Sequence, residues 1–326
     1  MIREMASDDE IARAVTALRA GAVIGLPTET VYGLAGDAAN PAAVARIFAI
    51  KGRPAAHPVI VHLPSAAHID RWARQVPDVA RRLAARFWPG PLTLVLPRAS
   101  TVLAAVTGGQ DTVALRVPRH PVALAVLAAF DGGLAAPSAN RYGRVSPTSA
   151  DHVRDDLGDE VAVVLDGGPS EVGLESTIVA CLDDEITVLR PGQLSLQEIE
   201  EAAGRRATPA KAAPRVPGST ASHYAPRTPV RLVAPDKLNA LLDAMHASET
   251  RVALLAPPHL APAAVVAARI DATSDAAALA RDLYANLRAL DRSDADLIVV
   301  AVPPVGPAWE AIHDRLRRAA TPADRG

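Results

Sequence analysis

A stretch of the chain between Arg205 and Thr228 is rich in proline and alanine and shows no apolar periodicity. Such a composition predicts an extended linker. At 326 residues the chain is also longer than one typical domain. We therefore expect a large N-terminal domain over residues 1–205, a linker over residues 206–228 and a small C-terminal domain over residues 229–326.

Short runs of β-branched residues alternate with helical patterns on both sides of this linker. The first part therefore predicts a mixed α/β domain. After residue 229 strands and helices alternate regularly, which predicts a smaller, Rossmann-like α/β domain with a parallel sheet and right-handed crossovers. The strands expected in the first part are 22–27, 59–63, 92–96, 112–117, 134–136, 161–165, 177–182 and 186–189.

The composition limits the class of protein. Hydrophobic residues make up 49% of the chain and charged residues 21%, as in ordinary folded proteins, and a net charge of -2 creates no general attraction for nucleic acid. An acidic N-terminus and the lack of an apolar window of roughly 18 residues argue against a signal peptide and a membrane span. We expect a cytoplasmic protein with no membrane partner.

Several common functional motifs are absent from the sequence. The single cysteine, Cys181, lies in an apolar run, so we expect an inert core thiol and no disulfide. His57 and His62 have no acidic or cysteine neighbour, so no metal site is predicted. The sequence also lacks the two glycine-rich phosphate loops and the G-x-S-x-G nucleophile turn. A phosphate would have to be bound in another way.

Two polar clusters, Thr28-Glu29-Thr30 and Lys51-Gly52-Arg53, bracket a helix expected over residues 41–50. Lys51 is the only lysine in the first two hundred residues of a chain that otherwise uses arginine. A compact ammonium suits a phosphate oxygen, which favours a binding role. The alternative is a helix that ends at Gly52, with two cations that interact favourably with the helix dipole.

A charged residue interrupts the apolar strand expected over residues 112–117. Arg116 stands where the alternation would place a core side chain, and a buried arginine needs an anion. Hydroxyl, amide and guanidinium groups also gather at the ends of other strands. Together they favour a ligand with several negative charges, such as a polyphosphate plus a carboxylate. These groups belong to Ser138, Asn140, Ser146, Ser176 and Arg190.

Five motifs occur in a characteristic order: PTETVYGL, KGRPAAHPVIVH, APSAN, GLEST and LRPG. In this order they resemble the YrdC-type threonylcarbamoyl-AMP synthases, and the HYAP segment with a second α/β domain resembles the long, two-domain form of that family. The resemblance implies that residues 1–205 form a catalytic domain around a twisted mixed sheet.

The family joins L-threonine, bicarbonate or CO2, and ATP into L-threonylcarbamoyl-AMP with release of pyrophosphate. The resemblance implies this nucleotidyltransferase activity, which serves threonylcarbamoyl-adenosine modification of tRNA. It also implies ATP as a substrate, Mg²⁺ held mainly by phosphates, and tRNA and downstream threonylcarbamoyl-transfer proteins as partners.

Site residues follow from the matching motifs. Lys51, Arg53 and Arg116 are the implied catalytic residues. The implied L-threonine contacts are Thr30, His62, Arg116, Ala136 through its backbone, and Ser176. The implied ATP contacts are Lys51, Arg53, Thr112, Ser138, Asn140, Ser146, Arg190 and Tyr224. The PAAH stretch after Arg53 departs from the polar residues of relatives, which leaves a contact by His57 open.

Other interpretations remain beside this one. A double-stranded RNA or tRNA-binding module would use the same basic groups without chemistry, although the nearly neutral composition with few aromatics argues against it. A carbamoyl-transfer domain of the hydrogenase-maturation type would need zinc-finger cysteines, and the chain has one cysteine. For the linker, we expect Tyr224 to act in a lid over the nucleotide; the alternative is a hinge anchor on the second domain.

Overall fold

The computed structural model describes residues 6–182, 185–208, 214–218, 220, 223–260 and 265–321. The chain divides into two compact units, the first formed by residues 1–142 with 146–219 and the second by residues 143–145 with 220–326. Along the chain, the main division between residues 219 and 220 falls inside the stretch predicted as a linker.

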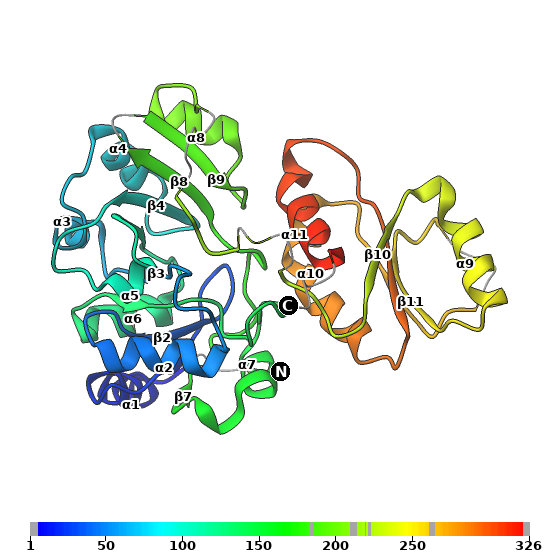
Figure 1. Ribbon diagram of the computed structural model, residues 1–326, viewed down its shortest axis with the longest axis horizontal. Coiled ribbons are helices and arrows are strands. Elements are labelled where there is room, and N and C mark those ends of the chain that lie inside the picture. The colour runs from blue at the N-terminus through cyan, green and yellow to red at the C-terminus, as the bar shows by residue number, and fades with distance from the viewer. Residues whose placement is uncertain are drawn as a thin grey trace. The chain divides into compact units, whose positions relative to one another are not determined.

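The described part of the first unit is built on a nine-stranded sheet in the order β7-β1-β2-β6-β3-β5-β4-β8-β9 (Figure 1). Three neighbouring pairs are parallel, namely β1 with β7, β3 with β5 and β4 with β8, and the other pairs are antiparallel. The predicted mixed α/β sheet is confirmed. The strands are β1 Ile24–Leu26, β2 Gly33–Asp37, β3 Ile60–His62, β4 Leu92–Pro97, β5 Thr112–Arg116, β6 Leu134–Ala135, β7 Val163–Val164, β8 Thr177–Leu182 and β9 Glu185–Arg190.

Helices and a large core cover one face of this sheet. Alternate residues of β5, Val113 and Leu115, point into that core together with residues of α2, α4, α7 and α8. On the opposite face, α1 and α6 pack over β1, β2 and β6. The helices of this unit are α1 Asp8–Arg19, α2 Pro41–Lys51, α3 Ile69–Trp72, α4 Asp78–Phe87, α5 Ala104–Thr107, α6 Pro121–Phe130, α7 Ala150–Leu157 and α8 Leu196–Ala203.

On the remainder of that opposite face, the described residues form a small apolar cluster in which Val216 packs with Ile60, Val95 and Ala114. No helical residue belongs to this cluster. We call this part of the sheet, formed by β3, β5, β4 and β8, the site face. Because side chains alternate along a strand, Arg116 points to the site face with Ala114.

Helix α2 shows how local sequence positions functional residues. Asn40 caps its start by accepting the backbone N–H of Ala42 and Ala43, and Pro41 occupies the first turn. The helix ends at Lys51, where Gly52 adopts a left-handed φ of 62°. The helix predicted over residues 41–50 is confirmed, and its end fixes the backbone from which Lys51 projects.

The second unit contains a parallel sheet in the order β10-β13-β11-β12 (Figure 1). Its core joins Val233, Leu254 and Val299 from three strands to Leu238 and Leu242 of α9. The predicted Rossmann-like parallel arrangement is confirmed. Its elements are β10 Val230–Val233, α9 Leu238–Ala247, β11 Val252–Ala256, β12 Ala268–Asp271, α10 Ala276–Asp291, β13 Leu297–Ala301 and α11 Glu310–Ala320.

Within the described ranges of both units, none of the helices combines the length and apolar character needed to cross a membrane.

The core position of Cys181 gives a test of the fold. The side chain is 0% exposed, and burial raises the pKa of its thiol to about 12. Because the thiolate is the reactive form, a disulfide reagent at pH 8 should leave the native protein unmodified and label one thiol per chain in denaturant. Rapid labelling of the native protein would contradict this core.

Candidate active site

A buried ion pair lies at the end of β5, on the site face. Nη2 of Arg116 is 2.8 Å from Oε1 of Glu29, and both residues are nearly inaccessible, at 3% and 1% exposed. Nη1 of Arg116 donates to the Thr30 hydroxyl at 2.8 Å, and Nε donates to the Gly90 carbonyl at 3.2 Å. A guanidinium has five N–H donors, so these three contacts leave donors for a ligand.

Glu29 corrects one step of the sequence argument. We expected a ligand to supply the anion that Arg116 needs, but this carboxylate of the same chain supplies it. Burial alone would raise the pKa of Glu29, yet the charge and hydrogen bond of Arg116 and the N–H of Arg119 outweigh burial and hold that pKa below its usual value of 4.5. The carboxylate is therefore ionised at neutral pH.

His62 lies beside this pair, because the parallel register of β3 and β5 pairs His62 with Arg116. Burial, together with the nearby charge of Arg116, lowers the pKa of His62 to about 3, so the imidazole is neutral. Its Nδ1 is buried and makes no hydrogen bond within the described part of the chain. A buried polar atom without a partner indicates a place for a ligand group.

A second set of contacts links Ser176 to Arg190 on the same face. The Ser176 hydroxyl is 2.7 Å from that of Thr93, and Nη2 of Arg190 donates to the Ser176 carbonyl at 2.9 Å. Nη1 of Arg190 donates to the carbonyl of Pro217 at 2.9 Å. Thr93 was missed from the sequence, although alternation along β4 places it on the site face with Val95.

Lys51 stabilises the turn that follows β6. Its Nζ donates to the carbonyls of Ser138 and Asn140, each at 2.5 Å. The turn is also held by the N–H of Tyr142, which donates to the Lys51 carbonyl at 2.8 Å. Burial, reinforced by the charge of Arg53, lowers the pKa of Lys51 well below its usual value. An added anion would therefore stabilise the ammonium, which retains a third N–H.

Arg53 and Ser146 are held by separate contacts. Nη2 of Arg53 donates to the Pro58 carbonyl at 2.8 Å, and its guanidinium lies 5.8 Å from the centre of the Tyr142 ring. The Tyr142 hydroxyl is 3.2 Å from Nδ1 of His57, which places that histidine next to the cluster. The Ser146 hydroxyl donates to Oε1 of Glu175 at 2.6 Å.

The three remaining predicted contact residues are Ala136, Thr112 and Tyr224. The Ala136 N–H donates to the Ile60 carbonyl at 3.0 Å, beside β3. Thr112 lies at the other end of β5 from Arg116. Tyr224 is buried within the second unit, where its ring stacks on Tyr284 at 5.7 Å and lies 5.2 Å from the guanidinium of Arg315. This packing is what the hinge-anchor alternative expects; a contact between Tyr224 and nucleotide stays a prediction.

The fold and these clusters define the chain as an α/β protein of the Sua5/YciO/YrdC type. Residues 16–192 match that family, which is described as "Telomere recombination", and residues 194–321 match the C-terminal domain of threonylcarbamoyl-AMP synthase. The threonylcarbamoyl-AMP synthase of Bacillus subtilis is 37% identical over 324 residues, which cover 96% of this chain and 94% of the relative. The chain belongs to the threonylcarbamoyl-AMP synthase family.

Solved structures agree with this assignment. Pyrococcus abyssi Sua5 complexed with L-threonine matches with a TM-score of 0.90 and 35% identity, covering 97% of this chain and 96% of that one. Escherichia coli YciO covers 59% of this chain and 94% of that one with a TM-score of 0.52 and 24% identity, which shows the fold alone. The match over residues 194–321 favours the synthase over the carbamoyl-transfer alternative.

The buried pair predicts a large effect on stability. Arg116→Ala would leave the Glu29 carboxylate buried without its cation, so we expect the unfolding free energy to fall by about 3–5 kcal/mol in urea at pH 7. The double variant Glu29→Gln/Arg116→Met, which removes both charges, should recover most of that loss. Equal stability of Arg116→Ala and the unchanged protein would contradict the pair.

The pair also predicts a pH dependence. Since the pKa of Glu29 is lowered on folding, its stabilisation is complete above the ordinary value of 4.5 and is lost as the pH falls through the lower folded value. In urea unfolding at a series of pH values below 4.5, the unchanged protein should therefore lose unfolding free energy relative to the double variant; a constant difference would contradict this assignment.

Proposed function

We propose that this chain synthesises L-threonylcarbamoyl-AMP from L-threonine, bicarbonate or CO2, and ATP, and releases pyrophosphate. The observation that carries the proposal is the buried, neutral His62 beside Arg116, whose Nδ1 makes no hydrogen bond to the described residues, in a chain of the synthase family. The likeness to a Sua5 structure complexed with L-threonine supports the choice of amino acid.

L-threonine would bind at the Glu29–Arg116 pair. The remaining N–H donors of Arg116 would donate to the carboxylate of L-threonine. The site would carry no large net positive charge there, because Glu29 already balances the guanidinium. The hydroxyl and amine of L-threonine would contact the neutral His62 and the hydroxyls of Thr30 and Ser176. We propose the backbone of Ala136 as a further contact, beside β3.

ATP would bind along the cations that are held by backbone carbonyls. Lys51, Arg53 and Arg190 would take the phosphates, with Thr112, Ser138, Asn140 and Ser146 as additional contacts. A carbonyl fixes the direction of a cation yet carries no net charge to cancel it. These side chains are therefore positioned in advance for a polyphosphate.

The reaction itself needs positioning more than a dedicated base. The free amine of threonine adds to CO2, a proton leaves, and the new carbamate oxygen attacks the α-phosphorus of ATP as the bond to pyrophosphate breaks. Because carbamate and triphosphate are both anions, Lys51, Arg53 and Arg116 would lower the repulsion between them and hold the reacting atoms in line.

Mg²⁺ would be held mainly by the phosphates and water. Within the described ranges there is no group of three or more His, Cys, Asp or Glu residues that could hold a metal ion, and Glu29 and Glu175 already contact Arg116 and Ser146. This donor set fits an ion that arrives with the nucleotide, where it would neutralise phosphate charge.

The linker is proposed to cover the site face, between a catalytic domain over residues 1–205 and a small domain over residues 229–326. Its residues 209–213, 219, 221 and 222 lie outside the described part. In the described part, Val216 packs on the site face, the Pro217 carbonyl accepts from Arg190, and the Gln110 amide contacts the backbone of Arg215 at 2.7 and 3.0 Å. These contacts support a lid that excludes water from the adenylate.

The product would pass to downstream threonylcarbamoyl-transfer proteins that modify tRNA. We propose the cytoplasm as the location because tRNA and ATP are both available there. The decisive experiment is to incubate the protein with ATP, L-threonine, bicarbonate and Mg²⁺ and to measure pyrophosphate. Release that depends on threonine is expected, and a folded protein without such release would refute the proposal.

Lys51 gives a sharper test of the nucleotide half. Lys51→Ala should raise the KM for ATP at least tenfold and change threonine binding little, because it removes a phosphate donor and the clamp on Ser138 and Asn140. Lys51→Arg should not restore activity, since a planar fork cannot replace a point donor to both carbonyls. The control is Lys237→Ala, an exposed lysine of the second unit. Normal turnover by Lys51→Ala would show that Lys51 is only a cation at the end of its helix and does not bind ATP.

A further inference from the structure

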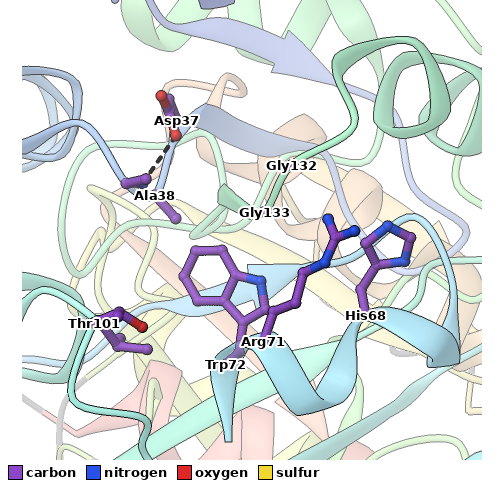
Figure 2. A pocket seen from close by; sticks show the side chains of 10 residues that line it. Asp37, Ala38, His68, Arg71, Trp72, Thr101, Gly132 and Gly133 are labelled. Atoms are coloured by element: carbon purple, nitrogen blue, oxygen red, sulfur yellow. Dashed lines mark hydrogen bonds between the residues drawn. The ribbon is translucent and has the colours of Figure 1, made fainter.

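A separate cavity of about 230 Å³ lies in the first unit away from Arg116 and His62 (Figure 2). Its walls come from the end of β2, from α3 and from the residues before β6. The indole ring of Trp72 forms one wall and packs against the large core on the side of the sheet opposite the site face. None of the residues proposed for threonine or ATP lines this cavity.

The cavity has a flat aromatic wall that depends on a glycine. A Cβ at Gly133 would lie 2.2 Å from Cζ2 of Trp72, so only glycine lets the ring lie directly against this backbone. The indole Nε1–H of Trp72 makes no hydrogen bond in the described part of the chain. The wall therefore offers a face for stacking and an unused donor.

Charged groups stand at the rim. Figure 2 shows the guanidinium of Arg71 beside the ring of His68, on the other side of Trp72 from Asp37. Arg71 is exposed and has no ion pair or hydrogen bond within the described ranges. Its neighbour Asp70 pairs with Arg81 at 2.8 Å. One oxygen of Asp37 accepts the N–H of Ala39 at 2.9 Å, and the other remains an acceptor.

From these features we infer that the cavity binds a nucleoside monophosphate, with its base against Trp72 and its phosphate at Arg71. The volume exceeds the roughly 150 Å³ that holds a benzene ring and is below the roughly 300 Å³ at which sites for larger ligands begin, so one base fits and the phosphate remains at the mouth. Stacking on an aromatic ring and pairing with arginine are the usual contacts of such a ligand. Asp37 would accept an N–H of the base.

The nucleotide could be free or part of an RNA strand, and the test separates these sources. Tryptophan fluorescence is titrated with AMP, adenosine, inorganic phosphate and a short adenosine oligoribonucleotide. Each titration is repeated with Lys51→Ala in the presence of L-threonine, so that binding at the proposed ATP site is recognised by its loss in this variant. We expect AMP to quench the fluorescence more strongly than adenosine or phosphate, because it engages Trp72 and Arg71 together. Quenching by the oligoribonucleotide but not by AMP would show that the cavity binds a nucleotide of an RNA strand.

Matched arginine variants decide the result. Arg71→Ala removes an exposed side chain outside the core and should weaken nucleotide binding at least tenfold. Arg74→Ala, an exposed arginine three residues further along that does not line the cavity, should bind as the unchanged protein does. Absence of quenching by both AMP and the oligoribonucleotide, or equal affinity in Arg71→Ala, would overturn the inference. The test measures no turnover, so its outcome is independent of the proposed synthesis.

Discussion

The buried pair of Glu29 and Arg116 is the interaction on which the rest of the site depends. It joins the segment before β2 to the end of β5, residues that are far apart in the sequence. Two charges can be buried here because each balances the other and because each makes further hydrogen bonds: Arg116 donates to Thr30 and Gly90, and Glu29 accepts the N–H of Arg119. The pair places a guanidinium with unused donors next to a neutral His62.

The other cations of the proposed site are held differently. Lys51 and Arg190 donate to backbone carbonyls, and those carbonyls belong to the turn after β6, to the start of β8 and to the linker. Each cation therefore ties two segments together. On this contrast we base the proposal that Arg116 binds the amino acid and that Lys51 and Arg190 bind the polyphosphate.

Much of this could be predicted from local sequence. Alternation in β5 placed Arg116 on a buried face, and a proline start with a glycine end defined α2 and hence Lys51. The partner of Arg116 could not be predicted, because a contact between residues 29 and 116 leaves no periodic signal. Alternation along β4 could have placed Thr93 on the site face, but its contact with Ser176 could not be predicted, and the ring of Trp72 against Gly133 is a tertiary contact as well.

The central claim is that Glu29 positions Arg116 for threonine, and calorimetry of L-threonine binding to Glu29→Gln tests it most directly. The amide keeps the size of the side chain and removes its charge. The account predicts at least tenfold weaker threonine binding, about 1.4 kcal/mol or more, with the affinity for ATP retained. Unchanged threonine affinity in a folded Glu29→Gln protein would contradict it.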